Sequence, residues 1–501
     1  MPPFAGRPSL QDADNSRQTI EAFLRKCKQP ALLEPGEELF PISEDNFALD
    51  SHAGRLTLQA WDRTRNLVRR VTGVNGELDG RLELAVERFA RKEGQLFLLD
   101  LARRSGSELG RRSGKLVFRE RFRLFVQRQF PEWKVAEVSA EADLEHSLSP
   151  AFPRAFLRYG QHGWAAIACP PEGDAGSMLS FGLIWLSHLR ARERRLAVEG
   201  LALYVPEGHE RQTALRLLCL DASSARFELF SYSERDHVAS IDPRDHGNID
   251  TRIEPYCQPQ PFASPMWSGI LSSPDVESAF KHDGRVSLRV RGLQFGEIRD
   301  GELRFGLKSR RLFSSPIQSA ELERLIAELT RVRSPDSAFR DHPLYRQLPE
   351  AWLESQVRSH IEAIDASLMP HIHGQVPAFA GGDRGVLDLL AVDRFGRLAV
   401  LELKASADIH LPLQALDYWV RVKWHLDRDE FRAKGYFPDV ALQSKPPRLL
   451  LVSPALEFHP TTEAILTYVS PMIDVERIGL GVEWRKSLQV MFRLKGADRP
   501  L

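Results

Sequence analysis

The feature that most constrains the fold is an apolar hairpin pattern in the C-terminal third that carries isolated charged residues. Two apolar runs flank the turn sequence Asp393-Arg-Phe-Gly396, which is typical of a β-hairpin. Side chains alternate across a strand, so Glu402 and Lys404 project from one face and the leucines next to them from the other.

Asp388 lies in the middle of the first apolar run. An ionised carboxylate buried there without a partner would cost several kcal/mol. A divalent cation between Asp388 and Glu402 would remove this cost, because hard oxygen ligands suit Mg²⁺. The sequence therefore predicts that these two carboxylates are metal ligands.

A helix is expected after the hairpin, and it carries Gln414-Ala-Leu-Asp-Tyr418. Together with Asp388 and Glu402-Leu-Lys404, this motif resembles the PD-(D/E)xK nuclease superfamily, in particular its RecB-like branch with a QxxxY motif. The resemblance covers roughly residues 345–501. Leu387 stands where the family often has Pro, which is a departure at a loosely kept position.

The resemblance implies a restriction-endonuclease-like fold, a mixed α/β sheet flanked by helices. It also implies a metal-dependent deoxyribonuclease that acts in DNA repair, recombination or defence. Asp388 and Glu402 would bind Mg²⁺ or Mn²⁺, and Lys404 would orient or deprotonate the attacking water. The glutamate that such enzymes often carry on the preceding helix would be Glu354.

Gln414 and Tyr418 are four residues apart, so on a helix they share one face and can reach phosphate or water together. Arg421 continues this face. Arg384, in the Gly-rich turn before Asp388, is a second candidate for phosphate contact. We expect DNA as the partner, with the choice between single and double strands left open.

Three alternatives stay open. Glu402 and Lys404 could form an exposed ion pair on an edge strand, and Tyr418 could be an ordinary half-buried aromatic residue. The protein could also be a catalytically inactive nucleic-acid-binding module. It could also be a scaffold subunit in a repair or phage-defence assembly. Besides DNA, the expected partner is a second copy of the chain or a repair or defence complex.

Composition adds limits on function. The chain has 501 residues and a formal net charge of zero, so nucleic-acid binding has to come from local patches. The four cysteines are scattered and indicate neither a zinc ribbon nor a disulfide framework. No apolar stretch is long enough for a membrane span, and we expect a cytoplasmic protein without membrane contact.

The expected domain order begins with a flexible N-terminus (residues 1–29) and a small, basic, β-rich domain (residues 30–115). Between residues 51 and 135 there are 19 Lys and Arg against 10 Asp and Glu. Arg69 and Arg70 are candidates for contact with the DNA backbone. The alternative is a solvated face, or a docking surface for acidic parts of the chain itself.

Residues 116–250 repeat the order of helices and strands expected in the C-terminal domain. We align Leu398–Lys404 of the C-terminal domain with Trp164–Pro170. In this alignment, Ala168 takes the position of Glu402 and Pro170 takes the position of Lys404. We therefore hypothesise a degenerate nuclease-like fold that serves architecture or nucleic-acid placement. The alternative is a chance similarity of two α/β patterns.

The remaining ranges complete the expected order. Residues 251–345 contain a Pro-rich linker, a β-hairpin with its turn at Arg299-Asp-Gly301, and an amphipathic connecting helix. Residues 346–501 form the nuclease-like domain. No phosphate-binding G-x-x-x-x-G-K-[ST] loop occurs in the sequence, so ATP-driven movement is not encoded in this chain.

Overall fold

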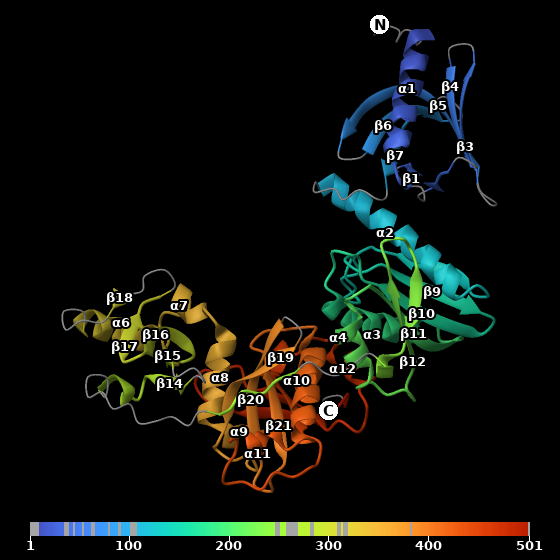
Figure 1. The fold of residues 1–501 in the computed structure, drawn as a ribbon. Helices are drawn as coiled ribbons and strands as arrows, with labels where there is room; N and C mark the ends of the chain where they lie inside the picture. The colour runs from blue at the N-terminus through green and yellow to red at the C-terminus, as the bar shows by residue number, and fades with distance from the viewer. Residues whose placement is uncertain are drawn as a thin grey trace. The chain divides into compact units, whose positions relative to one another are not determined.

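The computed structural model describes most of residues 10–498 (Figure 1). The ranges not described within these limits are 35–39, 44–45, 53–54, 62–65, 79–80, 89–91, 101–107, 246–250, 257–268, 281–284, 308–311, 314–318 and 381–382. The chain divides into two units. One comprises residues 1–142 and 149–160, and the other comprises residues 143–148 and 161–501.

The first unit contains an antiparallel half-barrel sheet in the order β2-β1-β7-β6-β5-β4-β3. Its strands are β1 (Pro30–Leu33), β2 (Phe40–Pro41), β3 (Phe47–His52), β4 (Arg55–Trp61), β5 (Asn66–Leu78), β6 (Arg81–Arg88) and β7 (Lys92–Asp100). Alternate residues of β4 are buried, as the period of two predicts. Helix α1 (Leu10–Lys26) covers this apolar face with Ile20 and Phe23. The expected β-rich N-terminal domain is thus confirmed, and a helix occupies part of the segment expected to be flexible.

Three further elements complete the first unit. They are helix α2 (Glu108–Gln129) and the antiparallel pair β8 (Lys134–Ser139) and β9 (Arg154–Tyr159). Phe118, Phe122 and Phe125 of α2 are buried at helical spacing. This face packs the helix against β8.

The second unit begins with the parallel strands β10 (His162–Ala168), β11 (Ala197–Pro206) and β12 (Arg226–Tyr232), which are followed by antiparallel β13 (Val238–Ile241). Helix α3 (Ala175–Arg192) connects β10 to β11, and helix α4 (Glu210–Leu217) connects β11 to β12. The short helix η1 (Pro243–Asp245) follows β13. Parallel strands require such crossover helices.

The C-terminal sheet has the order β19-β20-β21-β22-β23-β24. Its strands are β19 (His373–Ala380), β20 (Asp383–Val392), β21 (Leu398–Leu403), β22 (Arg448–Pro454), β23 (Val475–Leu480) and β24 (Val490–Lys495). Its helices are α7 (Pro343–Arg346), α8 (Pro349–Ser359), α9 (Ile361–Ile364), α10 (Leu411–Leu426), α11 (Glu430–Ala433), η3 (Ala455–Glu457) and α12 (Thr462–Leu466). The sheet is mixed, because β21, β22 and β23 are parallel and the other neighbours are antiparallel.

Strands β10 to β13 and β21 to β24 share one pattern of parallel, parallel and antiparallel pairing, with a helix after each of the first two strands. At the end of β21, the amide of Lys404 donates to the carbonyl of Val452 (3.0 Å). At the end of β10, the amide of Cys169 donates to the carbonyl of Tyr204 (2.8 Å). These equivalent bonds place Cys169 at the position of Lys404, whereas the sequence alignment put Pro170 there. The alignment was displaced by one residue because the sequence does not contain the pairing register.

A small antiparallel sheet lies between these two sheets in the chain, in the order β14-β15-β16-β17-β18. Its elements are β14 (Glu277–Phe280), β15 (Val286–Val290), β16 (Leu293–Arg299), β17 (Glu302–Phe305), β18 (Leu312–Phe313) and the packed helix α6 (Ser319–Val332). The predicted turn joins β16 to β17, where Asp300 and Gly301 have φ of 50° and 82°. Such angles suit a two-residue hairpin turn. The expected linker also contains strand β14.

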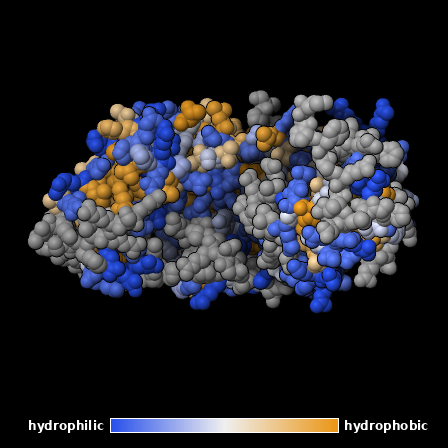
Figure 2. Space-filling model, turned by 90° about the horizontal axis from the view of Figure 1, so that it is seen from above, coloured by the Kyte–Doolittle hydropathy of each residue, from blue (hydrophilic) through white to orange (hydrophobic). Residues whose placement is uncertain are grey.

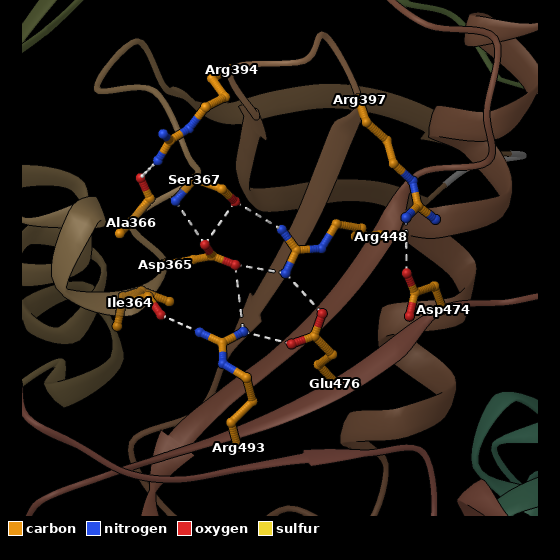
Figure 3. Close-up of polar contacts among 10 residues, drawn as sticks. All are labelled: Ile364, Asp365, Ala366, Ser367, Arg394, Arg397, Arg448, Asp474, Glu476 and Arg493. Atoms are coloured by element: carbon orange, nitrogen blue, oxygen red, sulfur yellow. Dashed lines mark hydrogen bonds and ion pairs between the residues drawn. The ribbon is translucent and has the colours of Figure 1, made fainter.

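An ion-pair network fixes the C-terminal sheet at the end where β22 and β23 begin (Figure 3). Arg448 Nη2 lies 2.6 Å from Asp365 Oδ2 and 2.8 Å from Glu476 Oε1. Arg493 Nη1 is 2.5 Å from the other oxygen of Glu476. The pKa of Asp365 is lowered to about 2 because hydrogen bonds from Ser367 and the Arg448 guanidinium outweigh the effect of burial. The network ties α9, β22, β23 and β24 together.

The surface is mainly hydrophilic on the face drawn in Figure 2, with small hydrophobic patches among the described residues. Isolated apolar side chains are common on protein surfaces. Within the described ranges, no helix has the length and apolar content needed to cross a membrane.

Candidate active site

The predicted hairpin is confirmed by strands β20 and β21. Leu389 pairs with Leu401, and this antiparallel register brings Asp388 beside Glu402. The turn is fixed by Asp393, whose carboxylate accepts hydrogen bonds from the amides of residues 395 and 397. Gly396 adopts φ of 88°, a conformation that glycine takes without strain. The turn therefore sets the register that brings the two acidic residues together.

Both faces of the hairpin are buried along β21, but they differ in charge. Leu389, Leu401 and Leu403 lie in the core cluster that includes Trp352 and Leu353 of α8. Because side chains alternate, Asp388, Glu402 and Lys404 belong to the opposite face, and α10 packs on β21 and β22. The three predicted catalytic residues thus share the face that the QxxxY helix covers.

Asp388 is held by the strand next to it. The amide of Leu403 donates a 2.9 Å hydrogen bond to Asp388 Oδ2. Burial raises the pKa of Asp388 to about 6, and the charge of Glu354 raises it further, while the Leu403 amide and Lys404 oppose the change. The Leu403 amide therefore orients the Asp388 carboxylate, but the surrounding groups offset its negative charge only in part.

Glu402 has a still less favourable environment for a negative charge. The residue is 3% exposed, and burial, followed by the charge of Asp388, raises its pKa well above the usual range. Its Oε2 atom has no hydrogen-bond partner among the described residues. Buried polar atoms are rarely left unpaired, so this oxygen is a candidate for binding a cation or a water molecule.

Lys404 supplies the positive charge in this cluster. Its Nζ is 3.8 Å from Glu402 Oε1 and 3.5 Å from Asp408 Oδ2. Burial lowers the pKa of Lys404, but Glu402, Glu350 and Asp408 together raise it above its ordinary value. The acidic neighbours thus favour the charged form of this lysine.

Helix α10 brings the QxxxY residues to the same place. Burial raises the pKa of Tyr418, and the charges of Glu402 and Asp388 raise it further, which places the phenol near both carboxylates. Gln414 Oε1 is buried and has no hydrogen-bond partner in the described part of the chain. Arg421 lies one turn further on, with its Cζ 5.9 Å from the centre of the Tyr418 ring.

Two acidic residues near the site were missed by the sequence analysis. Glu350 raises the pKa of Asp388 and Glu402, and Asp408 contacts Lys404. Glu350 lies one helical turn before Glu354, the candidate that is 7% exposed and paired with Arg358. Spacing on α8 could have indicated Glu350, whereas the position of Asp408 depends on the loop after β21.

Asp388 and Glu402 are the candidate ligands for Mg²⁺. No group of three or more His, Cys, Asp or Glu residues is arranged to hold a metal ion among those described. Mg²⁺ is often bound by one or two carboxylates, with waters and substrate phosphates as its other ligands. Asp388 and Glu402, with the unpartnered Glu402 Oε2, fit that smaller requirement.

The candidate nucleic-acid contacts lie in different surroundings. The side chain of Arg384 is outside the described part of the chain. Arg69 is paired with the carboxylate of Glu34 at 2.7 Å, and Arg70 Nη1 is 2.9 Å from Glu87. Both N-terminal arginines therefore contact acidic residues of their own domain.

Known proteins give no further guide to the site. Comparisons with protein-family models, with curated proteins and with solved structures found no match to this chain.

Proposed function

We propose that the chain is a metal-dependent deoxyribonuclease of the RecB-like PD-(D/E)xK type, with Asp388, Glu402 and Lys404 as its catalytic residues. The observation that carries the proposal is the buried pair of acidic residues, whose carboxylates both have raised pKa values. A buried carboxylate pair is destabilised unless a cation compensates it. Lys404 alone, 3.8 Å from Glu402, leaves one oxygen of that carboxylate unpartnered.

The proposed roles follow from these contacts. A divalent cation held by Asp388 and Glu402 would polarise the scissile phosphate and lower the pKa of a bound water. The Leu403 amide orients Asp388. Lys404 would orient or deprotonate the attacking water and stabilise negative charge that develops on phosphorus. Gln414 and Tyr418 orient water or phosphate from α10.

The sheet of β10 to β13 is, in this proposal, a nuclease-like fold without metal ligands. Its strand pattern and connecting helices repeat those of β21 to β24. Ile167 occupies the position of Glu402, and Cys169 that of Lys404, according to the equivalent hydrogen bonds. Neither residue supplies a carboxylate, so this sheet serves architecture or nucleic-acid placement.

The test is cleavage by the purified full-length protein. Single- and double-stranded DNA are incubated with Mg²⁺, with Mn²⁺ and with a chelator. Metal-dependent cleavage that disappears in Glu402→Ala and Lys404→Ala supports the nuclease. Salt-dependent binding without cleavage would replace it with an inactive binding module, and the absence of both would favour the scaffold.

A further inference from the structure

The two sheet folds within residues 161–501 contact each other through an arrangement with approximate twofold symmetry. Leu220 and Val469 form an isolated antiparallel bridge. The amide of Asp221 donates to the carbonyl of Tyr468, and the amide of Ser470 donates to that of Cys219, both at 2.8 Å. Each segment follows the second crossover helix of its own fold, so equivalent parts of the two folds meet.

The helices of the two folds also contact each other in equivalent pairs. Helix α3, which follows β10, packs on α12, and α10, which follows β21, packs on α4. In each pair, the first crossover helix of one fold meets the second crossover helix of the other. The contact is therefore the one expected for a dimer of the fold, made within a single chain.

One contact in this interface is made by a single pair of charged side chains. Arg216 of α4 donates from Nε to Asp417 Oδ1 (2.8 Å) and from Nη2 to Oδ2 (2.7 Å). Gln212 Nε2 adds a third bond, 3.0 Å from Asp417 Oδ2. The side chains of Arg216 and Asp417 are only 5% and 15% exposed, and such bidentate pairs fix orientation as well as distance.

Asp417 lies on α10 between Gln414 and Tyr418. On an α-helix, it is displaced by about 60° from Gln414 around the axis, so a rotation of α10 that moves Asp417 moves the QxxxY residues as well. Arg216 also donates to the carbonyl of Gly176 at the start of α3, which anchors the guanidinium in its own fold.

We propose that Arg216 is a positioning residue for the nuclease site, through which the fold without metal ligands sets the orientation of α10. The proposal rests on the proposed nuclease function. Arg216 does not touch substrate or metal, and it acts by holding Asp417. The first fold is thereby an internal partner that the catalytic helix requires.

The test compares Arg216→Met with Lys423→Met in the full-length protein. Lys423 lies on α10 and pairs with Asp427, the C-cap residue of that helix, on an exposed surface. Lys423→Met therefore removes a charged pair of α10 outside the interface and is a matched control. Arg216→Met is expected to lower kcat for DNA cleavage at least tenfold with KM changed less than threefold. Lys423→Met is expected to keep both values within twofold, and Arg216→Met doing the same would overturn the proposal.

Two further variants separate positioning from loss of folding. The double variant Arg216→Asp with Asp417→Arg exchanges the two charges. Its kcat is expected to be at least threefold higher than that of Arg216→Asp alone. Arg216→Lys keeps the charge but not the bidentate geometry, and it is expected to give an intermediate kcat. A failure of the exchange together with full activity of Arg216→Lys would show that only the charge matters, against the proposal.

Amide hydrogen exchange tests the contact even if the wild-type protein does not cleave DNA. Residues 411–426 are expected to exchange at least tenfold faster in Arg216→Met, with β20 and β21 unchanged. Unchanged exchange in α10 would overturn the positioning role. If α10 exchanges faster in Arg216→Met but the wild-type protein does not cleave DNA, Arg216 positions α10 and the proposed nuclease function is wrong.

Discussion

The amide of Leu403 donates to the carboxylate of Asp388 across the hairpin, at 2.9 Å. This bond orients one proposed metal ligand from the strand that carries the other. It also offsets only part of the cost of burial, because the pKa of Asp388 remains raised to about 6. The site is therefore organised before any cation binds, and its remaining instability is electrostatic.

Asp388→Asn is expected to stabilise the metal-free protein while it abolishes cleavage. The folded-state pKa lies above the ordinary value, so the contribution of Asp388 to stability is present below pH 4 and lost as the pH rises to about 6. At pH 8 asparagine removes this penalty and can still accept from Leu403. We expect a rise of about 2 °C in the unfolding midpoint with chelator present.

The control for this measurement is Asp427→Asn, which changes an exposed carboxylate at the C-cap of α10. Its unfolding midpoint should stay within about 1 °C of the wild-type value. A lower midpoint for Asp388→Asn than for this control would show that the carboxylate stabilises the metal-free fold.

Glu402→Gln is expected to weaken Mn²⁺ binding about tenfold or more and to remove cleavage. The substitution keeps the size of the buried side chain but eliminates one of two candidate ligand charges. Calorimetric titration with Mn²⁺ measures the affinity, and a gel assay measures cleavage. Glu457→Gln, at an exposed position, is the matched control, and equal Mn²⁺ affinity in both variants would exclude Glu402 as a ligand.

Much of the C-terminal sheet could be predicted because its signals are local. The turn at Asp393 and the alternation around Glu402 each depend on neighbouring residues only. The Leu403 hydrogen bond and the contact of Lys404 with Asp408 could not be predicted, because they depend on strand register and on a loop. The pairing of Arg216 with Asp417 joins residues far apart in the chain, and no period in the sequence indicates it.

Arg69→Gln is expected to destabilise the N-terminal unit by about 2 kcal/mol, because it removes a bidentate, charge-assisted pair of hydrogen bonds to a buried carboxylate. The side chain of Glu34 is 1% exposed in this pair. Arg70→Gln is the comparison, since its pair with Glu87 is more exposed and is expected to contribute less than about 1 kcal/mol. Urea unfolding followed by fluorescence measures both, and equal effects would contradict the structural role of Arg69.

The Asp365 network predicts the behaviour of the C-terminal sheet in acid. The pKa of Asp365 is lowered from 3.8 to about 2. Its contribution, about 2 kcal/mol by linkage, is therefore complete above pH 4 and is lost as the pH falls to about 2. Asp365→Asn should lower the urea midpoint at pH 6 and flatten its dependence on pH between 4 and 2.

Asp474→Asn serves as the comparison in this experiment, because Asp474 also pairs with an arginine, Arg397, but is more exposed. This variant should keep the wild-type slope of stability between pH 4 and 2. Arg448 contacts both Asp365 and Glu476, so removal of one acid leaves the guanidinium partly paired and the fold intact. An unchanged acid slope in Asp365→Asn would mean that other carboxylates, and not this network, determine unfolding of the sheet in acid.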